Sequence, residues 1–387
     1  MYFHTPLRQI GSEMAFRSTI IPFSRAFWDV ELLGGGVLPA GPCFFYGNHS
    51  NNYDPFILNA FTELGGCTAG VMTMEYLRRG PLASLFKASG IVGTQKRVPE
   101  PHLIRQIWKM ANEGRRIVVF PEGGRRWDGR PAPWIESTAK LFMKLGIPVY
   151  PIRIHGSYLG WPRWATYPRP ALIKLEVCPA IDFSGSTSLQ QGLKLLKQPI
   201  SFDENVVEDE IKPGWAYKPA HGITKLLYRD LETGSFGGYA ETGTHLIQKS
   251  SVRMWKVLPD STLQDEQTGH ISLSGDLYAE IKSLPLPQEA DYILRHRARY
   301  RFEGLDSNLK TYHHVIAELG RDHITLFNGE TSRGESIPFE QILYTGLEKS
   351  SMIWIMTRKG TFHIELFEGS VLAWQDVLNT LIPELNC

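Results

Sequence analysis

Residues 44–55 read Phe-Phe-Tyr-Gly-Asn-His-Ser-Asn-Asn-Tyr-Asp-Pro, an apolar run that breaks at Gly47 and leads to His49 and Asp54. The short aromatic run is typical of a buried strand. Asp54 before Pro55 predicts a helix start, because aspartate can accept from the unpaired amides of a first turn and proline fits the first helical position. We therefore expect His49 and Asp54 to lie in a turn between a strand and a helix.

A second apolar run also ends in a polar turn. Residues 117–126 read Ile-Val-Val-Phe-Pro-Glu-Gly-Gly-Arg-Arg. Taken alone, Asp54 could be only a helix cap and His49 only a hydrogen-bonded structural residue. Two strand ends that both deliver charged residues are instead typical of a site at the carboxyl edge of an α/β sheet.

Composition sets broad limits on the protein class. The chain has 387 residues, a formal charge of +1, 42% hydrophobic residues and 21% charged residues, which allows two or three ordinary globular domains and gives no reason to expect nucleic acid. The cysteines lack metal-ligand or disulfide-framework spacing, so we expect reduced thiols in a cytosolic setting, and no metal. These cysteines are Cys43, Cys67, Cys178 and Cys387.

The start of the chain raises the question of membrane contact. No run reaches the roughly 18 apolar residues of a membrane span, and no signal peptide is apparent, so we expect a soluble or peripheral protein. Within the predicted N-terminal segment 1–35, residues 15–28 mix large apolar residues with two arginines. Such a segment can lie in a bilayer interface or pack on the domain that follows, and Pro22 argues against one continuous helix.

Residues 36–185 alternate short apolar strands with helical patterns, which predicts an α/β domain whose sheet is flanked by helices. The expected strands are Cys43–Tyr46, Thr68–Thr73, Ile117–Phe120, Val149–Ile154 and Ile173–Val177. The expected helices are Pro55–Glu63, His102–Asn112 and Ser137–Leu145.

The remaining residues predict a mostly β C-terminal region. Acidic residues, including Asp203 and Glu204, lead to Pro213-Gly214, so residues 186–220 are interpreted as a linker. Residues 221–285 predict a small β-rich module, in which the absence of cysteine excludes a zinc ribbon. Residues 286–387 predict strands followed by a helix over 370–382 and resemble a pleckstrin-homology or GRAM-type module. Such a module would dock on a membrane or a protein, or would be a structural appendage.

Four blocks in order carry a family resemblance. Residues 48–54 resemble the N-H-x-x-x-x-D block of the glycerolipid acyltransferases, of 1-acylglycerol-3-phosphate acyltransferase type, and residues 120–125 resemble their F-P-E-G-T-R block. Residues 90–97 and 146–152 stand where the second and fourth blocks of the family lie. The chain departs from the family at Gly124, where threonine is usual, and at Arg126, where serine is usual. These departures leave the acceptor open.

The resemblance implies an acyltransferase of phospholipid biosynthesis. It would move an acyl group from acyl-CoA or acyl-carrier protein to the hydroxyl of lysophosphatidic acid or a similar lysophospholipid, at the cytoplasmic face of a membrane and without metal or redox cofactor. Such a reaction needs a base, for which we expect His49, and a group that orients the base, for which we expect Asp54. The alternatives are acylation of another lipid at oxygen or nitrogen, or a catalytically silent lipid-binding tether.

Further residues are expected to bind the substrates. Arginine grips phosphate through forked donors, so Arg125 is expected to hold the phosphate of the acceptor, aided by Lys96 or Arg97. Glu122 is expected to organise the pocket and to hydrogen-bond the glycerol, with Gly123 beside it.

Overall fold

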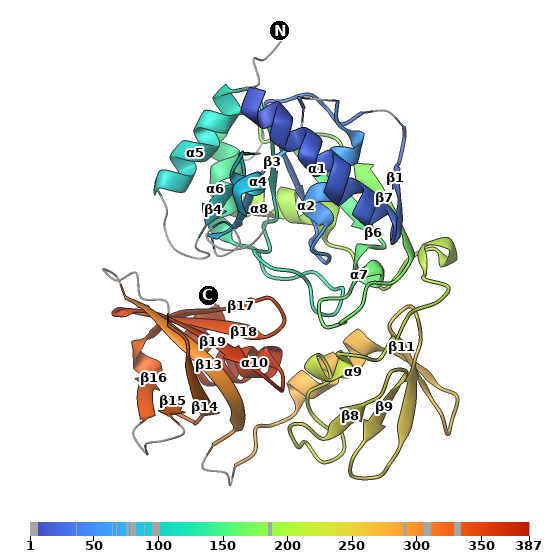
Figure 1. Ribbon diagram of the computed structural model, residues 1–387, viewed down its shortest axis with the longest axis vertical. Helices are drawn as coiled ribbons and strands as arrows, with labels where there is room; N and C mark the ends of the chain where they lie inside the picture. Colours follow the sequence, from blue (N-terminus) through green and yellow to red (C-terminus); the bar gives the residue numbers. More distant parts are fainter. Residues whose placement is uncertain are drawn as a thin grey trace. The chain divides into compact units, whose positions relative to one another are not determined.

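The computed structural model describes residues 7–35, 37–63, 65–66, 68–74, 77, 83–88, 90–94, 101–184, 188–288, 292–304, 311–328 and 334–386. The chain divides into two compact units. The first unit is Met1–Pro162 with Pro168–Ala216, and the second is Arg163–Tyr167 with Tyr217–Cys387. Figure 1 draws the first unit in blue to yellow-green and the second mainly in yellow to red.

The first unit is built on a seven-stranded sheet, in the described part of the chain, with strand order β1-β7-β6-β2-β5-β3-β4. Its strands are β1 (Trp28–Leu32), β2 (Cys43–Gly47), β3 (Ala69–Thr73), β4 (Val92–Thr94), β5 (Arg116–Val119), β6 (Val149–His155) and β7 (Ala171–Val177). Strands β6, β2, β5, β3 and β4 run parallel, whereas β7 is antiparallel to β6. The carboxyl ends of the neighbours β6, β2 and β5 therefore meet at one edge of the sheet.

Helices cover both faces of this sheet. They are α1 (Leu7–Arg25), α2 (Asp54–Ile57), α4 (Ala83–Ala88), α5 (Pro101–Asn112), α6 (Glu136–Leu145), α7 (Ser157–Gly160) and α8 (Leu189–Lys197), with short 3₁₀ turns η1 (Leu58–Phe61), η2 (Gln198–Ile200) and η3 (Asp209–Ile211). Phe44 packs in one apolar core with residues of α5, α6 and α8, whereas Phe45 packs in the other with Ile57 of α2 and Trp28 of β1. Fully burying such a side chain contributes about 1.5–3 kcal/mol. The predicted buried strand at the start of the motif is confirmed.

The structure differs from the sequence-based expectations at three places in the first unit. Residues 189–200 are not part of a linker, because Leu193 and Leu196 of α8 are buried in the first core. Helix α1 is continuous through Pro22, which lies near its end, and Phe16 and Ile21 are buried. Strand β1 had no counterpart among the predicted strands. No helix in the described ranges is both long and apolar enough to cross a membrane.

The described residues of the second unit form two antiparallel sheets, so the prediction of a mostly β C-terminal region is confirmed. One sheet has the order β12-β11-β10-β9-β8 and comprises β8 (Tyr239–Glu241), β9 (His245–Gln248), β10 (Met254–Val257), β11 (Thr262–Asp265) and β12 (Ile271–Leu273). A 3₁₀ turn, η4 (Ile223–Lys225), precedes this sheet, and a helix, α9 (Ser274–Ser283), follows it. The β-rich prediction for residues 221–285 did not include α9, whose Tyr278 and Ile281 are buried.

The other sheet has the order β16-β15-β14-β13-β19-β18-β17. Its strands are β13 (Leu294–Gly304), β14 (His313–Leu319), β15 (His323–Asn328), β16 (Gly334–Pro338), β17 (Ile342–Glu348), β18 (Met352–Thr357) and β19 (Gly360–Leu366). The short turns η5 (Phe339–Gln341) and η6 (Pro383–Asn386) flank the later strands and the helix α10 (Val371–Leu381). The helix predicted over 370–382 is confirmed as α10, and its Trp374 and Leu378 are fully buried.

Candidate active site

The turn after β2 is fixed to the neighbouring strand β6. The side chain of Asn48 exchanges two hydrogen bonds with the backbone of Ile154, donating to its oxygen and accepting from its nitrogen, both at 2.9 Å. Gly47 permits this approach, because a Cβ there would lie 2.7 Å from the carbonyl oxygen of Ile152. The end of β2 is therefore held rigidly just before His49.

The structure brings His49 and Asp54 into contact. Nδ1 of His49 lies 2.9 Å from Oδ2 of Asp54, whose side chain is buried, while the side chain of His49 is 18% exposed. The imidazole ring also stacks on Phe120, with ring centroids 4.3 Å apart. With the proton assigned to Nδ1 by this contact, Nε2 is the nitrogen that can take a proton from a substrate.

Asp54 has a different role from the helix cap that its position before Pro55 predicts. Its carboxylate accepts from the backbone nitrogens of Ser50, at 2.8 Å, and Asn51, at 2.9 Å, which precede it, and from the hydroxyl of Ser157. No side chain caps α2 at Tyr53. The capping prediction is therefore wrong, and the donors instead fix the carboxylate against His49.

The turn after β5 is joined directly to the turn that carries His49. The backbone nitrogen of Arg126 donates to the carbonyl oxygen of His49 at 2.7 Å, and that of Gly123 donates to the oxygen of Phe120 at 3.1 Å. Gly123 has φ +67°, where a side chain is strained, and a Cβ there would also meet the side chain of Ile135. Two strand ends that are far apart in the sequence thus form one site, as predicted.

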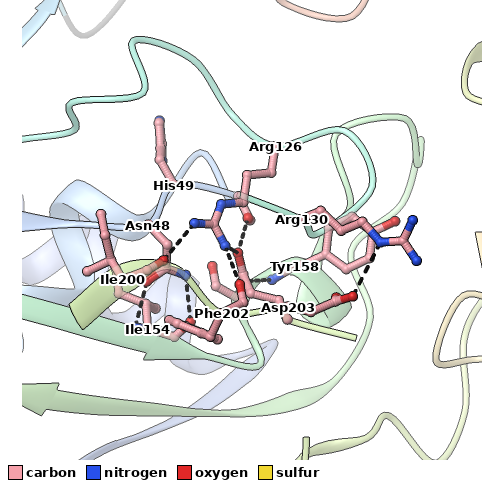
Figure 2. Close-up of polar contacts among 12 residues, drawn as sticks. Asn48, His49, Arg126, Arg130, Ile154, Tyr158, Ile200, Phe202 and Asp203 are labelled. Atoms are coloured by element: carbon pink, nitrogen blue, oxygen red, sulfur yellow. Dashed lines mark hydrogen bonds and ion pairs between the residues drawn. The ribbon is translucent and has the colours of Figure 1, made fainter. Parts of the chain in front are cut away.

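Arg126 lies inside the protein rather than facing a substrate. Figure 2 shows its guanidinium surrounded by oxygen atoms: Nη1 donates to the backbone oxygen of Phe202 and Nη2 to that of Ile200, both at 3.0 Å. It pairs with Glu122 at 2.6 Å and with Glu204 at 3.2 Å, and all three side chains are fully buried. Five N–H donors in a planar fork suit arginine to this task.

The geometry gives Glu122 a different partner from the predicted glycerol. Both its oxygens accept from Nε of Arg126 at 3.0 Å, and its side chain has no exposed surface. Burial raises the pKa of Glu122 in spite of the arginine. Glu122 therefore holds Arg126 in place, and its contact with the glycerol stays a prediction.

Glu204 was not predicted as a site residue, because it stands in an acidic stretch that is typical of exposed surface. It is buried, and its carboxylate accepts from the hydroxyl of Ser50 at 2.6 Å and from the backbone nitrogen of Tyr158 at 3.2 Å. Burial raises the pKa of Glu204 to about 7, and Arg126 opposes this rise. The one available signal was Arg126 in place of the usual serine, because a buried arginine needs a carboxylate partner.

The remaining predicted anion-binding residues are Arg125, Lys96 and Arg97. Arg125 is partly exposed in the turn after β5. Lys96 and Arg97 lie outside the described residues. Within the described ranges, no group of three or more His, Cys, Asp or Glu side chains has an arrangement that could hold a metal ion. The contact of His49 with Asp54 supports proton transfer at His49, oriented by Asp54.

Known proteins resemble the first unit. Residues 30–155 match the family model described as Acyltransferase. The chain is 28% identical over 160 residues to a 1-acyl-sn-glycerol-3-phosphate acyltransferase of Pseudomonas aeruginosa, covering 40% of this chain and 60% of that relative. It is 23% identical over 141 residues to one of Limnanthes alba, covering 36% of this chain and 50% of that relative.

A solved structure is also similar. The 1-acyl-sn-glycerophosphate (LPA) acyltransferase PlsC from Thermotoga maritima is 20% identical, with a TM-score of 0.40, over 49% of this chain and 78% of that chain. The chain spans 60% and 50% of the two curated relatives named above, which is less than two thirds of either. The family model and the curated relatives therefore agree that residues 30–155 are similar to acyltransferases of the glycerolipid type.

Proposed function

We propose that the protein transfers a fatty acyl group from an acyl thioester to the hydroxyl of lysophosphatidic acid or a similar lysophospholipid. The observation that carries the proposal is the contact between His49 and the buried Asp54, at 2.9 Å, on the edge of the sheet where the turn after β5 is also attached. The names of the relatives support the same reaction class.

The proton steps follow from the geometry of His49. Nε2 accepts the proton of the acceptor hydroxyl as its oxygen attacks the thioester carbonyl, and Asp54 stabilises the imidazolium that forms. The tetrahedral intermediate then expels the thiolate, which takes the proton from His49. The substrate hydroxyl stands where a serine protease has its serine, so no covalent acyl-enzyme is needed.

Arg125 would bind the phosphate of the acceptor. It is partly exposed, next to Arg126, whose backbone contacts His49, so a phosphate there would lie near the base. Arg126 itself does not argue for an unusual acceptor, because its guanidinium is buried among carboxylates of the protein. The departure from the usual serine is thus an internal packing feature, and lysophosphatidic acid remains the first acceptor to test.

The test is release of free thiol from acyl-CoA or acyl-carrier protein by the purified chain, with and without lysophosphatidic acid. The expected result is release that depends on the acceptor, with phosphatidic acid as product. Monoacylglycerol, which lacks the phosphate, should be a much poorer acceptor. Release that needs a lipid without phosphate would favour the alternative acceptors, and no release with any lipid would favour the tether.

The site of action and the C-terminal modules belong to the same proposal. The acceptor is a lipid, so the protein would act as a peripheral protein at the cytoplasmic face of a membrane. The sheet β13–β19 with helix α10 would serve as a pleckstrin-homology-like or GRAM-like docking module. Binding of the purified chain to vesicles, with and without anionic lipid, tests this part separately.

A further inference from the structure

We propose that Glu204 is a positioning residue for His49, acting through the hydroxyl of Ser50 and the guanidinium of Arg126. This inference rests on the proposed function, because it concerns the same site. Glu204 lies in the segment after η2, outside residues 30–155 that match the family model. The site would thus be completed by a part of the chain that the family comparison does not cover.

The first link runs through Ser50, which follows His49 directly. Its hydroxyl donates to Oε1 of Glu204 at 2.6 Å, while its backbone nitrogen donates to Asp54 at 2.8 Å. Ser50 has no exposed surface. Glu204 therefore holds the side chain of Ser50, while Asp54, which orients the base, holds its backbone.

The second link runs through Arg126. Its Nη1 lies 3.2 Å from Oε1 of Glu204, and its backbone nitrogen donates to the carbonyl oxygen of His49 at 2.7 Å. Glu204 therefore contacts the side chains of two residues whose backbones hold His49 or Asp54. A displacement of the Glu204 carboxylate would therefore displace His49 through Ser50 and through Arg126.

The segment that carries Glu204 is itself fixed to the turn after β5. The backbone nitrogen of Glu204 donates to the oxygen of Gly129 at 3.0 Å, and Nδ2 of Asn205 donates to the oxygen of Asp128 at 2.7 Å. Arg130 also pairs with Asp203 of the same segment, with Nε and Oδ2 3.3 Å apart, and Figure 2 draws this ion pair. The carboxylate thus has a rigid support, which a positioning residue requires.

The balance of buried charges argues against a purely stabilising role for the carboxylate of Glu204. Two buried carboxylates, Glu122 and Glu204, share the single guanidinium of Arg126, with Asp54 nearby. Burying charges costs free energy that ion pairing repays only in part, so an apolar residue would often serve stability equally well. A positioning role for Glu204 is instead supported by its contacts with Ser50 and Arg126, which hold the turn that carries His49.

The test compares Glu204→Gln, Ser50→Ala and the double variant, with Glu208→Gln as the matched control. Glu208 makes an exposed ion pair with Lys174, so the same chemical change is made away from the site. We expect kcat to fall on the order of 10²-fold in Glu204→Gln, with little change in KM, because the base is displaced while substrate contacts remain. Ser50→Ala should lower kcat by about 10-fold, the effect of one hydrogen bond.

The double variant separates positioning from general destabilisation. If the two side chains act as a unit, its kcat should be close to that of Glu204→Gln alone rather than the product of the two losses. The proposal would be overturned if the fold-losses in kcat of the two single variants multiplied in the double variant. It would also be overturned if the variants had a lower melting temperature but a normal kcat per folded molecule. Ser50→Ala keeps the pair of Glu204 with Arg126, so it remains informative if Glu204→Gln does not fold.

A second readout does not depend on activity. The proton on Nδ1 of His49, followed by nuclear magnetic resonance with ¹⁵N-labelled histidine and assigned by its loss in His49→Ala, should exchange faster in Glu204→Gln and Ser50→Ala but not in Glu208→Gln. An unchanged signal in both variants would overturn the proposal. If the wild type has this signal but transfers no acyl group, the proposed function fails while the positioning role is still measured.

Discussion

Two arginine-rich regions of the protein look alike in sequence and differ in structure. In the turn after β5, Arg126 is buried and pairs with Glu122 and Glu204, side chains that are also fully buried. In strand β13, alternate arginines pair on the sheet surface with acidic residues: Arg295 with Glu318, Arg297 with Glu368, and Arg299 with Glu365. Arg297 and Glu368 are 68% and 51% exposed.

The difference shows that burial, not residue type, decides what an arginine does. Exposed pairs contribute little because water and salt screen them and because long side chains lose entropy. A buried arginine is instead indispensable to its partners, since removing it leaves charges without compensation. The arginine row of β13 is therefore not a free basic patch, and Arg126 is not a substrate ligand.

The largest loss of stability is expected for Arg126→Met, which tests the contrast between buried and exposed arginines. The substitution keeps the approximate side-chain volume and removes the charge. Two buried carboxylates would lose their partner, so the free energy of unfolding should fall by about 3–5 kcal/mol. Urea unfolding followed by circular dichroism measures it. Stability within about 1 kcal/mol of the wild type would mean that the buried network is not formed as described.

The next effect is a pH dependence of the free energy of unfolding that is opposite in sign to that of the surface row, where the hydrogen bond from Arg297 lowers the pKa of Glu368. The pKa of Glu204 is about 7, above its ordinary value of 4.5, because of burial. Between these values the folded state holds a proton that the unfolded state releases, so this group lowers stability as pH rises from about 4.5 to about 7. Urea unfolding at several pH values should show a flatter profile in Glu204→Gln than in the wild type, and identical slopes would contradict the assignment.

Arg125 and Arg126 should also separate in their effects on substrate. Arg125→Ala should raise KM for lysophosphatidic acid by about 10-fold, the loss of a charge-assisted contact, with little effect on stability. Initial rates at several acceptor concentrations measure it. An unchanged KM for the phosphorylated acceptor would remove Arg125 from the binding site.

The smallest effect is expected in the surface row. Arg297→Met, the same change as at Arg126, should alter the free energy of unfolding by no more than about 1 kcal/mol. The measurement is the same urea titration. A loss comparable with that of Arg126→Met would break the contrast between the two regions.

The sequence predicted the parts of the fold that depend on local pattern. The ends of β2 and β5 were visible because apolar runs break at polar turns, and the contact of His49 with Asp54 needed only five residues of chain. The role of Glu204 could not be predicted, because its partner Arg126 lies 78 residues away and an Asp-Glu pair in a polar stretch reads as solvated surface. Strand β1 also depends on a distant partner, β7.

The most direct test of the account is acyl transfer by His49→Ala. Purified wild type and variant would be compared for release of thiol from acyl-CoA that depends on lysophosphatidic acid, with melting temperatures to confirm folding. We expect a loss of roughly 10²- to 10⁴-fold in kcat with the fold retained, since a general base typically contributes that much. A folded variant that transfers the acyl group at the wild-type rate would contradict the assignment of His49 as the base.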